Sequence, residues 1–226
     1  MRKLYPLLSV LFLIYWGCEN YQDTTPTEVT LWGEVYSVEN TTELDLGHNG
    51  LTGSIPPEIG NLTNLTKLIL EGNQLSGSIP PEIWNMTNLT YLNLSGNDND
   101  LSNGLSGSIP PEIWNLTNLI SLNLSDNQLT GYIYSEIGNL PNLTELRLDY
   151  NQLTGSIPSE IVNLTNLEWL TLNNNQLTDT IPNKICNFDI NWSSSTYFRI
   201  FNNQLCPPYP SCIEDYVGEQ DTSDCP

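Results

Sequence analysis

One leucine-spaced phrase recurs along this chain and constrains its fold more than any other feature. Residues 143–158 carry the phrase in full, as LxxLxLxxNxLxGxIP. Its asparagine recurs at intervals of 24, 24, 30, 24, 24 and 28 residues, at Asn49, Asn73, Asn97, Asn127, Asn151, Asn175 and Asn203. A period in this range indicates units that stack on one another in a solenoid, because each unit is too small to bury its own apolar face.

Each unit is expected to form one coil with a strand on one side and a short helical turn on the other. In the LxL segment the leucines alternate with other residues, which predicts a short strand with its leucines pointing inward. The Gly-x-Ile-Pro segment then bends and extends the chain, and Pro57-Glu58 and its equivalents suit the start of a helical turn. We therefore predict an α/β solenoid: a right-handed superhelix with short parallel strands on the concave side and irregular or 3-10 structure on the convex side.

The recurring asparagine is predicted to be structural. It falls where the chain leaves the strand, and its amide can donate and accept hydrogen bonds with backbone groups of adjacent coils that would otherwise be buried without partners. Acidic residues recur at the helical turns, where a carboxylate suits a helix N-terminus, so we predict neither a metal site nor a cofactor there. This acidic column comprises Glu58, Glu82, Glu112, Glu136 and Glu160.

The beginning of the chain has the pattern of an export signal. Arg2 and Lys3 precede an apolar run, residues 4–16, that is too short to span a bilayer, so residues 1–17 are predicted to be a signal peptide. The sequence before Cys18 resembles a bacterial lipobox, which predicts lipidation of Cys18; plain secretion with one odd thiol is the alternative. We assign residues 18–30 to a polar tether, 31–43 to an N-terminal cap, 44–205 to about seven repeats and 206–226 to an acidic, Cys/Pro-rich C-terminal cap.

The four cysteines other than Cys18 are predicted to form two disulfides, which is consistent with an oxidising compartment. Zinc is the rival interpretation, but the chain lacks the CxxC spacing and the nearby histidine that it would need. Three pairings are possible and the sequence leaves all three open. These residues are Cys186, Cys206, Cys212 and Cys225.

The LxGxIP variant of the phrase resembles the plant-specific class of leucine-rich repeats, found in receptor-kinase ectodomains and polygalacturonase-inhibiting proteins. The resemblance runs from Leu44 to Leu205. The segment from Trp32 to Tyr36 is similar to the N-terminal cap of those proteins, which usually carries paired cysteines that this cap lacks. With the lipobox-like start, this departure favours a bacterial lipoprotein that is exported to the cell surface or outer membrane, or released outside the cell, and uses the same class of repeat.

The charge and the histidine content of the chain exclude some classes of function. The chain has 6 basic and 26 acidic residues, a net charge of −20, which disfavours nucleic acid and anionic lipid as partners. His48 is the single histidine and lies near no nucleophile motif, so we predict no enzymatic activity. The predicted function is a cell-surface or secreted binding module for a protein, peptide or glycan, with membrane contact through the lipid anchor. The alternatives are a structural or adhesive coat component, or an inhibitor of a wall-degrading enzyme.

Binding is predicted on the C-terminal half of the concave face. Residues between and after the leucines of each strand should point out of the sheet toward solvent. There Arg147 and Arg199 share a face with aromatic residues, and these residue types dominate binding hot spots. The alternative is that Trp169 and Tyr197 only cover the sheet near the cap. The predicted ligand-binding residues are Tyr91, Glu145, Arg147, Asp149, Tyr150, Trp169, Tyr197, Arg199 and Phe201.

The third unit carries six residues more than the regular 24-residue unit, around residues 97–104. Insertions that interrupt a repeat are common places for functional loops. The Asp/Asn spacing has some likeness to a calcium loop, but the distal glutamate is missing, so we predict a turn rich in asparagine and glycine.

Overall fold

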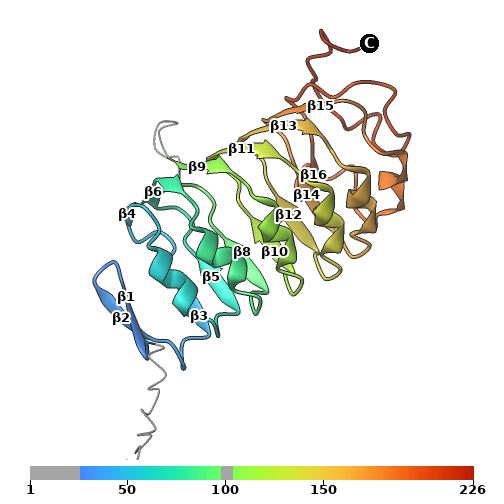
Figure 1. Cartoon of the computed structure of the whole chain (residues 1–226). Helices are drawn as coiled ribbons and strands as arrows, with labels where there is room; N and C mark the ends of the chain where they lie inside the picture. The colour runs from blue at the N-terminus through green and yellow to red at the C-terminus, as the bar shows by residue number, and fades with distance from the viewer. Residues whose placement is uncertain (1–25, 98–103) are drawn as a thin grey trace, which may run out of the picture.

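The computed structural model describes residues 26–97 and 104–226, which form a stack of coils with parallel strands on two of its sides (Figure 1). The predicted signal peptide, Cys18, most of the tether and insertion residues 98–103 lie outside the described residues. Among the described helices, none combines the length and the apolar composition needed to cross a lipid bilayer.

The predicted strands form one seven-stranded parallel sheet that runs the length of the stack. Neighbouring strands pair in register, so that Leu122, Leu146 and Leu170 occupy equivalent positions. The outward surface of this sheet is the concave face. In spatial order the strands are β3 (Glu43–Asp45), β5 (Lys67–Ile69), β8 (Tyr91–Asn93), β10 (Ser121–Asn123), β12 (Glu145–Arg147), β14 (Trp169–Thr171) and β16 (Phe198–Arg199).

The LxGxIP segments form a second set of parallel strands, which the sequence analysis did not predict. It expected a bend followed by extended chain, whereas neighbouring coils hydrogen-bond here as well. Gly131 and Gly155 lie in this sheet with φ of 90° and 74°, a conformation that residues with a Cβ rarely adopt. One sheet contains β7 (Gly77–Ser78), β9 (Leu105–Ser108), β11 (Gln128–Tyr132), β13 (Gln152–Ser156) and β15 (Gln176–Thr178), and another pairs β4 (Thr52–Gly53) with β6 (Gln74–Leu75).

The third side of each of the first six coils is a short 3-10 helix, as predicted. Each helix buries its isoleucine; Ile137 and Ile161, for example, are completely buried. The first five helices carry a glutamate in the first turn, where the predicted acidic column falls. The helices are η1 (Pro57–Asn61), η2 (Pro81–Asn85), η3 (Pro111–Asn115), η4 (Ser135–Asn139), η5 (Ser159–Asn163) and η6 (Asn183–Asn187).

The inward leucines and isoleucines pack into one continuous core that extends from Val29 to Val217. The two ends of this core are covered by structures of different kinds. At the N-terminal end lies an antiparallel hairpin of β1 (Glu28–Leu31) and β2 (Glu34–Ser37), which buries Leu31. At the C-terminal end the cap buries Ile213 and Val217. Covering both ends allows a solenoid to remain soluble.

Asn151 shows how the recurring asparagine holds adjacent coils together. Its Nδ2 donates to the carbonyl oxygens of Leu148 and Asp149, both at 3.2 Å, and to that of Leu124 in the preceding coil at 3.0 Å. Its Oδ1 accepts from the backbone N–H of Leu129 at 2.9 Å. One buried amide thus supplies partners for backbone groups of two coils.

The same bond to the preceding coil recurs along the stack. In each case Oδ1 of the asparagine accepts the N–H of a leucine 22 or 26 residues earlier. Asn49 departs from this pattern: it is exposed, and its Nδ2 donates within its own coil, to Gly47 O at 2.9 Å. Its coil is the first of the stack and has no earlier repeat to bind. The asparagines that bond across coils are Asn73, Asn97, Asn127, Asn151, Asn175 and Asn203.

A second set of asparagines, which the sequence analysis missed, bridges the coils on the surface. Asn142 Nδ2, for example, donates to Thr117 O of the preceding coil at 3.2 Å. Each of these residues is the second asparagine of the Asn-Leu-Thr-Asn-Leu phrase or its equivalent. The set comprises Asn64, Asn88, Asn118, Asn142 and Asn166.

The disulfides join Cys186 to Cys212 and Cys206 to Cys225, which settles the pairing that the sequence left open. The first attaches the C-terminal cap to η6, and the second joins the first residue of the cap to its end. The cap also hydrogen-bonds to the turn that follows β16, because Asn202 N–H donates to Glu219 O at 2.7 Å. The cap therefore covers the edge at which the stack ends.

We predict that Asn151→Leu lowers the free energy of unfolding by about 1–3 kcal/mol, because the substitution leaves buried backbone groups of two coils without partners. The measurement is urea unfolding followed by circular dichroism. Asn142→Leu is the matched control: it removes an exposed bond to the preceding coil and should cost less. Equal unfolding midpoints for Asn151→Leu and the wild type would refute the structural role.

Candidate functional site

The outward side chains of the concave face form three columns that cross the strands. The register of the sheet places Glu145 beside Trp169 and Arg147 beside Thr171. The first column is Glu43, Lys67, Tyr91, Ser121, Glu145, Trp169 and Tyr197. The second is Asp45, Ile69, Asn93, Asn123, Arg147, Thr171 and Arg199. The third follows the strands and is Gly47, Glu71, Ser95, Ser125, Asp149, Asn173 and Phe201.

The middle of the concave face is a buried polar network whose members bond to one another. Asn93 Oδ1 accepts from the backbone N–H of Ser95 at 3.1 Å and from its hydroxyl at 2.7 Å. Asn123 Oδ1 accepts from Ser125 in the same way, at 3.1 and 2.8 Å, and Asn123 Nδ2 donates to Ser95 Oγ at 3.2 Å. Because these polar groups already have partners, this part of the face has little capacity left for a ligand.

Charged side chains lie beside this network in the coils nearer the N-terminal end. Glu71 accepts from Asn93 Nδ2, and its other oxygen lies 3.7 Å from His48 Nε2. Lys67 Nζ lies 5.7 Å from the centre of the Tyr91 ring. Partial burial, and then the nearby charges of Glu145 and Glu71, raise the pKa of Tyr91 above its ordinary value.

The C-terminal half of the face holds a cluster of one cation and two aromatic rings. The guanidinium carbon of Arg147 lies 5.3 Å from the centre of the Trp169 ring, and Trp169 meets Tyr197 edge to face with ring centres 5.1 Å apart. Glu145 Oε1 lies 4.0 Å from Arg147 Nη1, and its Oε2 accepts from the Ser121 hydroxyl at 2.6 Å. We call Arg147, Trp169 and Tyr197 the aromatic cluster; Tyr197 is 42% exposed.

The other predicted ligand-binding residues are less closely grouped. Tyr91 lies on β8, two strands from β12. Tyr150 is 47% exposed at the edge of the face, with φ of 51°. Asp149 is buried, and its carboxylate accepts a hydrogen bond from the Thr171 hydroxyl of the next coil. In the free protein this side chain therefore links two coils.

Two further predicted residues lie beside the cap. Arg199 donates from Nε to the carbonyl oxygen of Ser195, which directs this part of its side chain along its own coil. Phe201 is half-buried and lies over Gly218, where an added Cβ would collide with it. The structure therefore brings Glu145 and the aromatic cluster together, and leaves the other predicted residues around this group.

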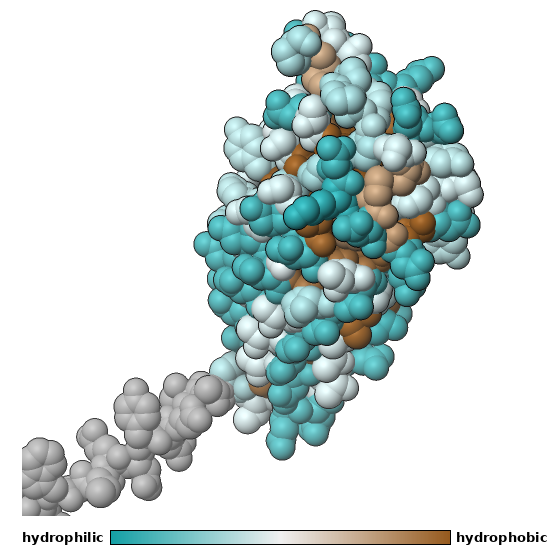
Figure 2. Space-filling model, turned by 90° about the vertical axis from the view of Figure 1, so that its right-hand side faces the viewer, coloured by the Kyte–Doolittle hydropathy of each residue, from teal (hydrophilic) through white to brown (hydrophobic). Residues whose placement is uncertain are grey.

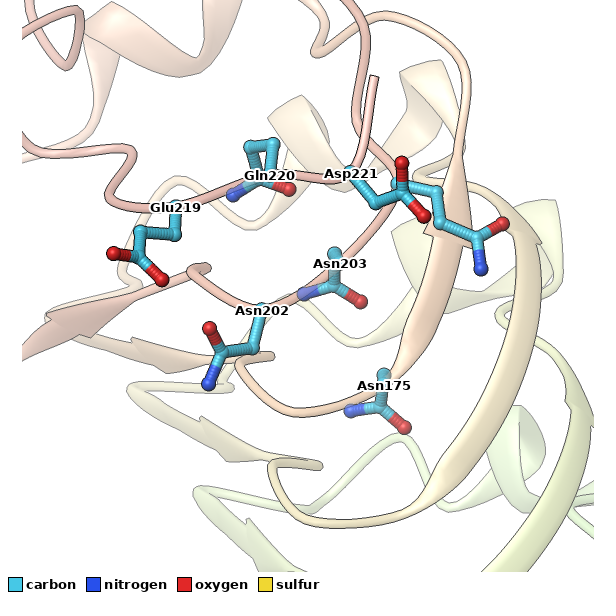
Figure 3. Close-up of a pocket in the computed structure, with 7 residues that line it drawn as sticks. Asn175, Asn202, Asn203, Glu219, Gln220 and Asp221 are labelled. Carbon is cyan, nitrogen blue, oxygen red and sulfur yellow. The ribbon is translucent and has the colours of Figure 1, made fainter. Parts of the chain in front are cut away.

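A pocket of about 380 Å³ lies where the cap meets the turn after β16. Figure 3 shows Asn202 and Asn203 on one side and the segment from Glu219 to Asp221 on the other. The side chain of Gln220 is already bonded, because its Nε2 donates to Ile200 O and Val217 O at 3.0 and 2.9 Å. The pocket lining as a whole is Asn175, Asn202, Asn203, Gln204, Glu219, Gln220 and Asp221.

Sequence reasoning missed this pocket, because its two sides come together only through the fold of the cap. The hydrogen bonds of Gln220 in this pocket attach the cap to the last coil. Within residues 26–97 and 104–226, no group of three or more His, Cys, Asp and Glu side chains is arranged to hold a metal ion. Hydrophilic residues dominate the face shown in Figure 2, and hydrophobic residues appear between them.

Comparison with known proteins agrees with this geometry. The model of a protein family described as leucine rich repeat matches residues 38–98, 100–153 and 135–177. No curated protein matches the chain. Among solved structures, the ectodomain of the Arabidopsis thaliana membrane receptor kinase GASSHO1/SCHENGEN3, in complex with CASPARIAN STRIP INTEGRITY FACTOR 2, is 38% identical with a TM-score of 0.64. That match covers 75% of this chain and 19% of the receptor chain.

Two other receptor kinases give similar matches. The Arabidopsis receptor kinase HAESA, in complex with the peptide hormone IDA and the co-receptor SERK1, is 32% identical with a TM-score of 0.64, over 73% of this chain and 26% of that one. A pollen receptor kinase 3 is 28% identical with a TM-score of 0.59, over 80% of both chains. The chain thus spans about a fifth to a quarter of the two Arabidopsis chains.

Proposed function

The chain belongs to the leucine-rich repeat family, and we propose that it is a non-catalytic binding module that recognises a protein, peptide or glycan through the C-terminal half of its concave face. One observation carries this proposal: the aromatic cluster lies partly exposed on a face whose middle is already closed by internal hydrogen bonds. Tryptophan, tyrosine and arginine are the residues that contribute most to binding when they lie together.

Two further points support a ligand-binding role. Aromatic side chains provide contact area at low cost in conformational entropy, and they also stack on sugars or apolar side chains. The solved HAESA and GASSHO1/SCHENGEN3 structures are complexes with a peptide hormone and with CASPARIAN STRIP INTEGRITY FACTOR 2. By analogy, we propose that the concave face of this chain also binds a ligand.

We predict that the double substitution Trp169→Ala, Tyr197→Ala weakens ligand binding, because it removes both rings from the aromatic cluster. A phage-displayed library of random linear peptides and a glycan array, both screened with the wild-type protein, would supply the probe. Affinity measured by biolayer interferometry should fall by about 30-fold or more, the loss typical of hot-spot residues.

The control is Tyr132→Ala, which removes a tyrosine that is 56% exposed on β11, away from the concave face. It should leave affinity unchanged. If the double variant folds and binds as the wild type does, then the site lies elsewhere, on the 3-10 helices or near the insertion.

We also propose that the protein is exported, that residues 1–17 are removed, and that lipidated Cys18 anchors it to a membrane through the part of the predicted tether that precedes β1. The two disulfides support an oxidising compartment. Intact-mass spectrometry of protein expressed in a bacterium with lipoprotein processing tests this: the expected N-terminus is an acylated Cys18. Cleavage at another position, or an unmodified Cys18, would rule the anchor out.

A further inference from the structure

The strands formed by the LxGxIP segments differ from the concave strands in charge. None of β4, β6, β7, β9, β11, β13 and β15 contains a charged residue, in a chain that has 26 acidic and 6 basic ones. We call the outward surface of β7, β9, β11, β13 and β15 the lateral face; Figure 1 shows the last four of these strands in a row along the upper side of the stack. The charged residues of the concave strands are Glu43, Asp45, Lys67, Glu145, Arg147 and Arg199.

The coil that contains β11 places two tyrosines at the lateral face. Tyr132 occupies the position that Ser108 and Ser156 hold in the neighbouring coils, and Tyr134 replaces the proline of the LxGxIP phrase. Ile133 between them is buried in the core. The two tyrosine rings meet edge to face, with ring centres 6.3 Å apart and planes at 86°.

The two rings have different surroundings. Tyr134 is half-buried and packs against the core, so it contributes to the fold. Tyr132 is 56% exposed, and its ring lies over Gly155 of the next coil, where an added Cβ would come within 2.7 Å of Tyr132 Cδ1. The glycine therefore leaves room for the ring beside the sheet, while Tyr132 stays open to solvent.

Hydroxyl groups flank the Tyr132 ring. On one side Tyr132 pairs in register with Thr154, whose Oγ1 donates to Gly131 O at 3.3 Å and can still accept. On the other side Ser108 of β9 pairs with Thr130 and is exposed. Because a hydroxyl both donates and accepts, an exposed aromatic ring is here bordered by uncharged groups that can form hydrogen bonds in either direction.

This combination matches the chemistry of a neutral sugar. A pyranose ring has C–H groups on its faces, which pack on an aromatic ring, and hydroxyls at its edge, which bond to other hydroxyls. An anionic sugar is disfavoured, because the lateral strands supply no cation and the chain has a net charge of −20. Five strands about 4.8 Å apart make a surface roughly 19 Å long, which accommodates several sugar units.

We propose that the lateral face binds a neutral polysaccharide, with a sugar ring packed on Tyr132 and sugar hydroxyls bonded to Ser108 and Thr154. This site lies on a different side of the stack from the aromatic cluster. The proposal therefore does not depend on the function proposed for the concave face.

The test is native affinity electrophoresis of the full chain in gels that contain hydroxyethyl cellulose or galactomannan, both neutral, or polygalacturonate, which is anionic. We expect at least one neutral polysaccharide to retard the wild-type protein and polygalacturonate to leave its mobility unchanged. The dissociation constant follows from the retardation at a series of polysaccharide concentrations.

The informative variant is Tyr132→Ser, because it restores the serine of the neighbouring coils and should fold as the wild type does, which circular dichroism checks. Its dissociation constant should rise by about tenfold or more, as for truncation of an aromatic anchor. Tyr132→Phe keeps the ring and should retain most of the binding. The double variant Trp169→Ala, Tyr197→Ala should bind the polysaccharide as the wild type does.

Three results would overturn the proposal. The first is wild-type mobility that neither neutral polysaccharide changes, and the second is equal retardation of the wild type and a folded Tyr132→Ser variant. The third is loss of retardation in Trp169→Ala, Tyr197→Ala with Tyr132→Ser unaffected, which would move the polysaccharide to the concave face and support the function proposed there. For a peptide bound to the concave face, changes at Tyr132 remain without effect, so the two sites are measured separately.

Discussion

The hydrogen bonds of the recurring asparagine are the interaction on which the rest of the structure depends. Where each strand of the concave sheet ends, the chain turns. Without the asparagine, the buried backbone groups of this turn would have no hydrogen-bond partners. The amide of Asn151 bonds to its own coil and to the coil before it, and equivalent residues repeat this along the solenoid. These bonds hold each coil against the one before it, which aligns both sheets and brings side chains of separate repeats into columns.

That alignment determines what the concave face can do. In the middle of the face, asparagine and serine side chains of adjacent coils bond to one another and leave few free groups. Toward the C-terminal end, Trp169 and Tyr197 occupy the same column as Ser121 and Glu145 and change its chemistry from polar to aromatic. The ability of this face to bind a ligand therefore depends on which side chain each repeat contributes to the shared columns.

Much of this arrangement could be predicted from the sequence, because it depends on local periodicity. The alternation of leucines indicated the strands, and equal spacing placed Glu145 beside Trp169 and Arg147 beside Thr171, as the register shows. A signal for the turn after each strand was also available: His48, Asp126, Tyr150, Asn174 and Asn202 share one position with Gly72 and Gly96, and all have positive φ. Glycine, asparagine, aspartate and histidine are common in that conformation.

Features that depend on contacts between distant segments could not be predicted in this way. The second sheet, the pairing of Cys186 with Cys212 and the pocket beside Gln220 all require the coils and cap to be placed first. Likewise, the sequence shows asparagine at 123 and at 173, but only side-chain packing decides that Asn123 is fully bonded and Asn173 is not.

Hydrogen–deuterium exchange with and without a ligand selected on the wild-type protein tests the central claim directly. If the C-terminal half of the concave face is the binding surface, added ligand slows exchange in peptides that cover β12, β14 and β16 and the turns after them. Exchange in η1 to η6 and in the second sheet should change little. Slower exchange confined to those helices or to the second sheet, with β12 to β16 unaffected, would contradict the account.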